Sequence, residues 1–98
     1  MNNIITTEKI EKYFSVTQKA LVMAKEALNP EHKAHAEDFF DMAQRYFDDA
    51  QFFYTEKEDA VLAFAALNYA HGWLDAGARA RFFLVSDSTL FTVDGKEK

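Results

Sequence analysis

The sequence predicts an all-α protein, an antiparallel up-and-down three-helix bundle with a short extended C-terminal tail. Two observations predict this fold. Apolar residues recur every three or four positions through three long segments, as they do along one face of an α-helix. The links between the segments are very short, and a short link forces consecutive helices to run antiparallel. We expect helices over about 7–28, 30–55 and 59–84, within a single domain that spans residues 1–98.

The first expected helix begins beside Thr6 and Thr7, whose hydroxyl groups can cap free amides at a helix start. Glu8 and Glu11 follow, where the positive end of the helix dipole favours negative charge. Its apolar positions keep a three-and-four spacing over about five turns, which predicts a helix with one buried side. They are Ile10, Tyr13, Phe14, Thr17, Ala20, Leu21, Ala24, Ala27 and Leu28.

Asn29 and Pro30 separate the first helix from the second. Asparagine is a good N-cap, proline is preferred at the first helical position, and the residue before a proline avoids helical angles. In the second helix large rings alternate with alanines, as when rings on one helix fill space left by small residues on another. This face comprises Ala36, Phe39, Phe40, Ala43, Tyr46, Phe47, Ala50, Phe53 and Tyr54. Phe52 falls on the outer side, as a single aromatic residue among polar ones.

The third expected helix begins after its cap, Asp59, and is the most apolar segment of the chain. Residues 60–84 contain only three charges, which belong to Asp75, Arg79 and Arg81. A helix that is apolar on nearly every side is normally buried or sandwiched. We therefore expect this helix to pack on more than one side.

Two glycines and the tail carry further expectations. Gly72 and Gly77 lie inside the third helix, where each costs ~1 kcal/mol relative to alanine. We expect close approach of a neighbouring helix or ring to explain them; the alternative is ligand access to the backbone. The tail lacks helical periodicity, and its apolar residues are expected to lie against the bundle: Leu90, Phe91 and Val93. We expect residues 95–98 to be disordered.

The composition narrows the classes of protein. The net charge is −5 and the pI about 5.1, with no basic patch in the sequence, so we expect neither nucleic-acid nor anionic membrane binding. Without cysteine the chain has no disulfide and no thiolate metal site. It lacks the pattern of a signal peptide and any apolar run near ~18 residues, so we expect a cytoplasmic protein. Fourteen Phe and Tyr residues exceed what a small helical core needs, unless some face a partner.

A polar stripe interrupts the third helix. Asn68, His71, Asp75 and Arg79 fall on one side of it and are spaced as neighbours along the helix surface. Three interpretations stay open. The stripe is a solvent-facing strip held by weak i,i+4 pairs, or a polar network buried between helices or subunits. In the third, it binds a small molecule or anion: Arg79 holds a carboxylate or phosphate, and Asp75 sets the tautomer of His71.

His32 and His35 form a His-x-x-His pair at the start of the second helix. Two imidazoles one turn apart can share a divalent metal, but a zinc site needs at least a third fixed ligand. We therefore expect an ordinary helix start and no metal. The motifs of di-iron bundles, zinc proteases, α/β-hydrolases and P-loop proteins are absent, so no cofactor and no catalytic residue is expected.

Two segments carry a family resemblance: residues 46–50 (YFDDA) and residues 69–77 (YAHGWLDAG). Through them, and from about residue 13 to 93, the chain resembles domain of unknown function 357, a group of short archaeal proteins. The resemblance implies a small three-helix up-and-down bundle and no established activity, substrate or catalytic residue. The chain departs from the family pattern at residues 57–58 and 81–83, since glycine is expected near both places.

Two functions follow from these observations. The first is a non-enzymatic helical interaction module that forms a homodimer, because the aromatic content and the apolar third helix exceed the needs of one small core. The third helix or the Phe52 side of the second would supply the interface. The alternative is a small-molecule or anion-binding protein, with enzymatic activity as one form of it, that uses the polar stripe.

Overall fold

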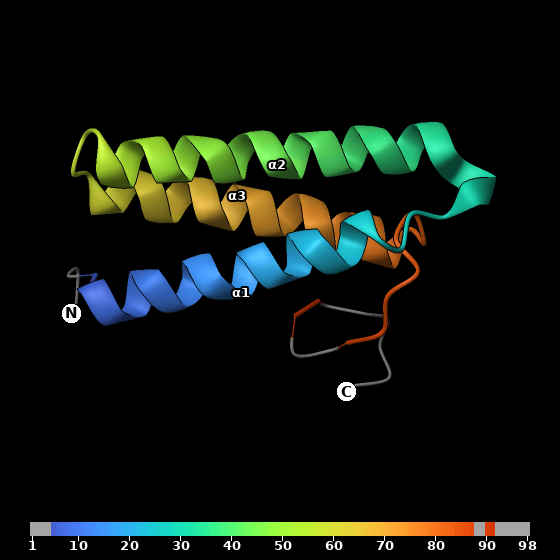
Figure 1. Cartoon of the computed structure of the whole chain (residues 1–98), viewed down its shortest axis with the longest axis horizontal. Helices are drawn as coiled ribbons and strands as arrows, with labels where there is room; N and C mark the ends of the chain where they lie inside the picture. Colours follow the sequence, from blue (N-terminus) through green and yellow to red (C-terminus); the bar gives the residue numbers. More distant parts are fainter. Residues whose placement is uncertain (1–4, 88–89, 92–98) are drawn as a thin grey trace.

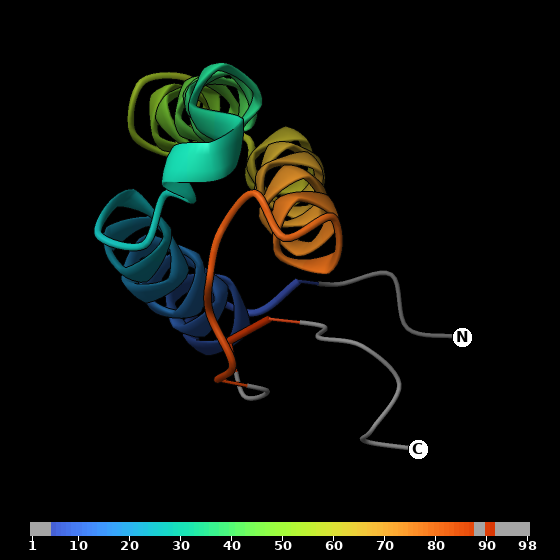
Figure 2. The ribbon, with the colours of Figure 1, turned by 90° about the vertical axis from the view of Figure 1, so that its right-hand side faces the viewer.

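Three long helices run up, down and up in the computed structural model, which describes residues 5–87 and 90–91 (Figure 1). Seen end-on, the helices occupy the corners of a triangle (Figure 2). The elements in chain order are α1 (Thr7–Lys25), the 3-10 turn η1 (Pro30–His32), α2 (Lys33–Thr55) and α3 (Ala60–Arg79). This arrangement confirms the predicted three-helix bundle.

Side chains cap the starts of α1 and α3 as the sequence predicts. The hydroxyl oxygen of Thr6 accepts a hydrogen bond from the amide of Lys9 at 3.1 Å. The carboxylate of Asp59 accepts one from the amide of Leu62 at 2.9 Å. Each cap satisfies one of the amides that a helix leaves without a partner at its start.

The junction between α1 and α2 is longer than expected. α1 ends at Lys25 rather than near residue 28, and Asn29 caps the 3-10 turn η1, after which α2 begins at Lys33. The reason is a long-range pairing. Leu28 and Phe83 form an isolated antiparallel bridge, so the chain leaves α1 early to meet the segment that follows α3.

The end of α3 corrects the predicted boundary. The helix stops at Arg79 instead of continuing to residue 84. Arg81 adopts left-handed backbone angles, with φ 65°. Its amide donates a hydrogen bond to the carbonyl of Ala78 at 3.1 Å, and the amide of Phe82 donates one to the carbonyl of Gly77 at 2.8 Å. This pattern is a Schellman motif, which closes a helix and reverses the chain.

The reversal places Phe83 over Gly77. A Cβ atom on Gly77 would lie 2.3 Å from the Phe83 ring, so only glycine leaves room for the ring there. The prediction of a close approach is thereby confirmed at this glycine. At Gly72, in contrast, nothing lies within 4 Å of a built Cβ, so no contact between described residues accounts for that glycine.

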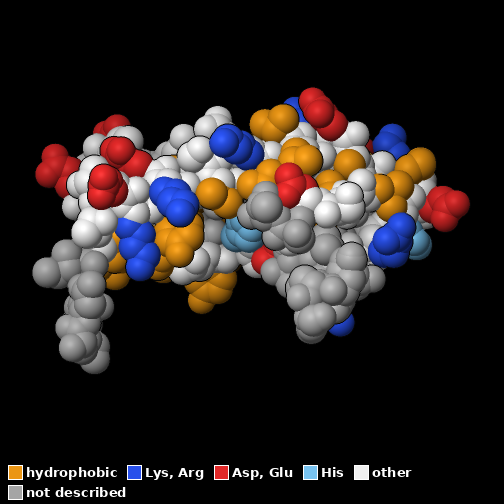
Figure 3. Space-filling model, turned by 90° about the horizontal axis from the view of Figure 1, so that it is seen from below, with side chains coloured by type: hydrophobic (Ala, Val, Ile, Leu, Met, Phe, Trp, Pro, Cys, Tyr) orange, Lys and Arg blue, Asp and Glu red, His pale blue; other side chains and the backbone are white. Residues whose placement is uncertain are grey.

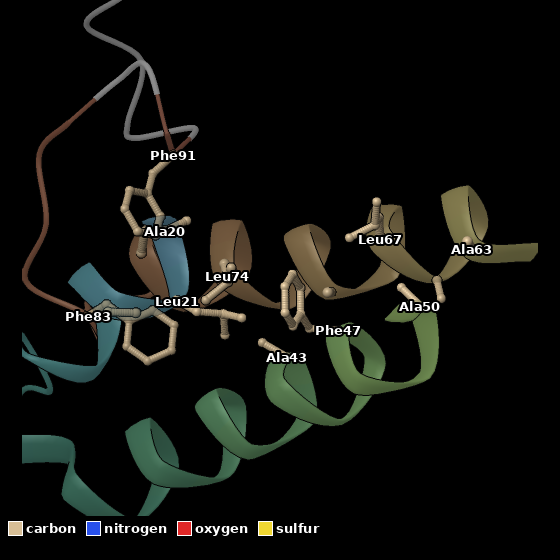
Figure 4. Close-up of a cluster of buried hydrophobic side chains, with 14 of the residues drawn as sticks. Ala20, Leu21, Ala43, Phe47, Ala50, Ala63, Leu67, Leu74, Phe83 and Phe91 are labelled. Carbon is tan, nitrogen blue, oxygen red and sulfur yellow. The ribbon is translucent and has the colours of Figure 1, made fainter. Parts of the chain in front are cut away.

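The core combines rings with closely packed alanines between α2 and α3, the two helices in most extensive contact (Figure 4). Ala43 and Ala50 on α2 and Ala63 and Ala70 on α3 are all fully buried. The described tail residues also pack on this core, Leu90 in part and Phe91 completely, as predicted. Val93 and residues 95–98, for which we also predicted positions, lie outside the described residues.

Candidate functional site

Three of the four stripe residues line a hollow between α1 and α3. Its volume is about 300 Å³. The side chains of His71 and Asp75 are 25% and 31% exposed, so both are partly shielded from water. The lining residues are Tyr13, Val16, Thr17, Leu67, Asn68, His71, Gly72 and Asp75.

His71 is held by two hydrogen-bonding partners from other parts of the chain. Its Nε2 lies 2.6 Å from the carbonyl oxygen of Leu90, and its Nδ1 lies 3.3 Å from the hydroxyl oxygen of Thr17. A carbonyl only accepts, so Nε2 carries a hydrogen, and in the neutral ring Nδ1 accepts from the Thr17 hydroxyl. Asp75 stands 3.8 Å from Nε2, too far for a hydrogen bond. Leu90 and Thr17, rather than Asp75, therefore set the tautomer.

Arg79 lies apart from this hollow. It is exposed in the last turn of α3, where it lines a separate depression with Asp75, Ala76 and Ala80. Of the described residues that line the hollow beside His71, Asp75 is the one with a formal charge. The geometry of the hollow joins Asn68, His71 and Asp75 without the arginine that anion binding would use. Ligand binding by the four stripe residues stays a prediction.

Thr17 is the functional residue that reasoning from the sequence missed. Its spacing placed it on the apolar side of the first helix, and it is indeed buried, but its hydroxyl group meets His71 there. A threonine at a core position among alanines and leucines was the available signal, because a buried hydroxyl needs a hydrogen-bonding partner. The partner comes from a residue far along the chain, which periodicity does not identify.

We expect the Thr17–His71 pair to contribute measurably to stability. Thr17→Val keeps the shape and removes the hydroxyl, so it should lower the free energy of unfolding by about 0.5–1.5 kcal/mol. His71→Ala also loses the bond to Leu90 and should cost about 1–3 kcal/mol. Urea denaturation of both variants and of the double variant measures these energies.

The double variant tests whether the two side chains act together. We expect a coupling energy of at least ~0.5 kcal/mol, because the two side chains are in contact. Thr55→Val is the matched control: this hydroxyl is exposed and bonds its own helix, so the change should stay within ~0.5 kcal/mol. Strict additivity of the two core variants would show that the pair does not interact.

His32 ends the 3-10 turn η1 and His35 lies in the first turn of α2, and the rings of both contact the ring of Phe82. Their ring centroids are 5.7 Å and 5.3 Å from that of Phe82, with His35 stacked on it. Within residues 5–87 and 90–91, no three His, Asp or Glu side chains gather as metal ligands. The pair packs on the reversed end of α3, and a metal role has no third ligand in the described part of the chain.

The outward side of α3 is a second candidate site, which we call the outer stripe. At 100° per residue its positions fall within an arc of about 100°. All of its residues are exposed and uncharged, and Val61 and Tyr69 are 64% and 62% exposed. The exposed residues Leu62 and Arg79 fall within the same arc, so Arg79 places one charge at the C-terminal end of this face. The outer stripe comprises Val61, Ala65, Tyr69, Gly72, Ala76 and Ala80. Their spacing of three and four resembles the seam of a coiled coil.

The surface near α1 differs from that outer stripe. Figure 3 shows the side of the molecule on which α1 and the chain after α3 lie, and Lys and Arg side chains there are spread among hydrophobic groups. Lys9, for example, places its ammonium group 5.9 Å from the centre of the Phe64 ring. On the outer stripe the central residues Ala65, Tyr69, Gly72 and Ala76 are uncharged, and Arg79 is the charged residue at its C-terminal end.

The fold is a small three-helix bundle, and its candidate sites lie on helix faces of the described residues. The family model described as Protein of unknown function (DUF357) matches residues 12–83, and the chain belongs to this family. The resemblance noted in residues 46–50 and 69–77 is thereby confirmed. No curated protein and no solved structure compared with the chain matches it. None of the described helices is long and apolar enough to cross a membrane.

Proposed function

We propose that the protein is a non-enzymatic interaction module that forms a homodimer through the outer stripe of α3. The observation that carries this proposal is Gly72. A glycine inside a helix costs ~1 kcal/mol relative to alanine, and no contact among the described residues requires it. Gly77 on the same helix shows what such a contact looks like, since the Phe83 ring fills the space beside it. A neighbouring helix from a second subunit would supply the equivalent contact at Gly72.

The outer stripe is complementary to a second copy of itself. In an antiparallel pair of α3 helices with the two-fold axis between Tyr69 and Gly72, each Tyr69 faces the small Gly72 of the other subunit. In the same register Val61 faces Ala80, and Ala65 faces Ala76. Tyr69 and Val61 thus meet small residues, and Ala65 meets another alanine. Arg79, which lies in the same arc, faces Leu62 and not a like charge. This pairing supports self-association over an unrelated partner.

Tyr69 is suited to be the central residue of such an interface. Its ring is 62% exposed, yet it stacks on Tyr46 at a centroid distance of 5.3 Å, which limits its rotation. An ordered aromatic side chain loses little entropy on binding, and tyrosine is common among residues that dominate binding energy. The Phe52 side of α2 is less favourable, because Phe53 and the ammonium group of Lys57 already contact the Phe52 ring.

We expect sedimentation equilibrium at micromolar concentration to show a species of twice the 11.3 kDa chain mass. Gly72→Leu should convert it to the monomer, because the leucine side chain would stand where the second helix approaches. Tyr69→Ala should also weaken the dimer. A stable dimer buries roughly 800 Å² per subunit, with aromatic residues enriched at its centre, where Tyr69 would lie.

Gly72→Ala separates dimer formation from folding. The monomer should gain about 0.8–1 kcal/mol of stability, since alanine favours the helix and meets no described atom within 4 Å. The dimer should become weaker at the same time. Ala34→Leu is the control for Gly72→Leu. It adds three carbons where Gly72→Leu adds four, on an exposed part of α2, and it should leave the dimer intact. A wild-type chain that sediments only at 11.3 kDa would rule out the proposal.

A further inference from the structure

A pocket lies between α1 and α2, and its residues take no part in the proposed dimer or in the hollow beside His71. Its volume is about 350 Å³, near the lower end of the range for small-molecule sites. It lies on different helix faces from the outer stripe of α3, so it does not depend on dimer formation. The lining residues are Glu11, Phe14, Ser15, Gln18, Phe47, Gln51, Tyr54 and Thr55.

Three aromatic rings form the apolar part of this pocket. Phe14 meets Phe47 edge to face at a centroid distance of 5.8 Å, and it meets Tyr54 at 5.4 Å with the rings tilted by 42°. Phe47 is buried, whereas Phe14 and Tyr54 are partly exposed toward the groove. The face of an aromatic ring carries partial negative charge, so tilted rings around an open space attract a cation.

The charge in the described lining of the pocket is negative, and so is the net charge of the α2 side, whereas α1 carries both signs. Among the described residues Glu11 is the one formally charged member of the lining, and no ion pair with another described residue holds that carboxylate. Residues 30–59, which include α2, carry nine Asp or Glu against three Lys or Arg. Elsewhere in this chain, lysine ammonium groups lie over aromatic rings: that of Lys9 over Phe64 and that of Lys57 over Phe52. The pocket's own rings have no such cation among the described residues.

We propose that this pocket binds an alkylammonium group that carries methyl groups on its nitrogen, with these methyl groups against Phe14 and Tyr54 and the charge beside Glu11. The rings supply cation–π attraction, the carboxylate supplies charge complementarity, and Gln18 and Gln51 supply amide oxygens at the rim. The group has two sources of the same chemistry: a free small amine, or a methylated lysine side chain of another protein. The experiment distinguishes them.

Choline and 3,3-dimethylbutan-1-ol are a matched pair of probes, because the alcohol has the same shape but a neutral carbon in place of the charged nitrogen of choline. We expect choline to shift the amide NMR signals of the pocket residues in the full chain saturably. We expect it to bind roughly three- to tenfold more tightly than the neutral alcohol. Equal affinity for the two probes would show an apolar pocket without cation recognition and would overturn the proposal. No saturable shift with any of the cationic probes, including the peptide described below, would overturn it too.

Two variants assign the effect to the named residues. Glu11→Gln should weaken choline roughly two- to fivefold, as for an exposed charge pair, and should leave the neutral alcohol unaffected. Tyr54→Leu keeps an apolar side chain but removes the ring, so choline should again lose affinity selectively. Glu26→Gln neutralises an exposed carboxylate at the other end of α1 and should change nothing. A loss of choline binding in Glu26→Gln equal to that in Glu11→Gln would contradict the assignment.

A peptide with one trimethyl-lysine, compared with the same peptide carrying unmodified lysine, tests the second source. Preference for the trimethylated peptide over choline supports a protein side chain as the natural ligand, and the reverse preference supports a free amine. Either result supports the alkylammonium site. Equal binding of the two peptides, combined with no choline binding, would show attraction to charge alone and would overturn it.

Discussion

Phe83→Ala is expected to lower the free energy of unfolding by about 3–5 kcal/mol, the usual range when a buried aromatic side chain is truncated. Phe83 is 1% exposed and is among the largest fully buried side chains. Its ring occupies the space that Gly77 leaves beside α3, so its removal would open a cavity next to a helix backbone that cannot collapse into it. Guanidinium denaturation with linear extrapolation measures the change.

Leu84 provides the matched control for this prediction. It follows Phe83 directly, but 48% of it is exposed. Leu84→Ala should therefore cost less than about 1 kcal/mol, since little apolar area leaves water at that position when the chain folds. Similar losses for the two variants would mean that the reversed segment stabilises the bundle by its backbone bonds and not through the Phe83 ring.

The sequence predicted those parts of the fold that local signals determine. Periodicity identified the three helices, and Thr6 and Asp59 identified two of their starts, because a cap acts on amides only two or three residues away. The end of α3 was predicted wrongly. Residues 80–84 have apolar spacing that continues a helix, but the Schellman motif at Arg81 ends α3 and the pairing of Leu28 with Phe83 holds the segment that follows.

At both places where the chain departs from the family pattern, a residue other than glycine has left-handed backbone angles. Glu58 has φ 51° and Arg81 has φ 65°, and these are the non-glycine residues in left-handed backbone among those described. Glycine was expected near both places, and it adopts such angles without a steric penalty. The turns are therefore kept although the glycines are replaced. The cost at Arg81 is offset by tertiary contacts of the segment that follows it.

The candidate site was predictable only within one helix. Spacing placed Asn68, His71 and Asp75 on one side of the third helix, and the structure does bring them into one hollow. The partners of His71 are Thr17 on α1 and a carbonyl beyond the end of α3, and no local pattern relates these three positions. The same limit applies to Gly72 and Gly77, which look alike in the sequence and differ only in what packs against them.

Asn29→Ala is expected to cost about 2–4 kcal/mol, because Asn29 joins the α1–α2 junction to the segment after α3 at one end of the bundle. Its side-chain oxygen accepts from the amide of Glu31 at 3.0 Å, and its side-chain nitrogen donates to the carbonyl of Arg81 at 2.8 Å. Its backbone amide also donates to Phe82 at 2.8 Å. Alanine would remove the cap, worth ~1 kcal/mol, and leave the partly buried Arg81 carbonyl without its donor, at a further ~1–3 kcal/mol.

Asn29→Asp separates these two contributions. Aspartate caps as well as asparagine, so it would retain nearly full stability if the bond to Glu31 were the main one. We expect it to be at least as destabilising as alanine, because a carboxylate oxygen would then face the Arg81 carbonyl at hydrogen-bonding distance without a hydrogen between them. Thr6→Ala removes a cap with no such second bond and should cost only about 1 kcal/mol. A near-native Asn29→Asp protein in urea denaturation would show that the bond across to α3 contributes little and that capping alone explains the asparagine.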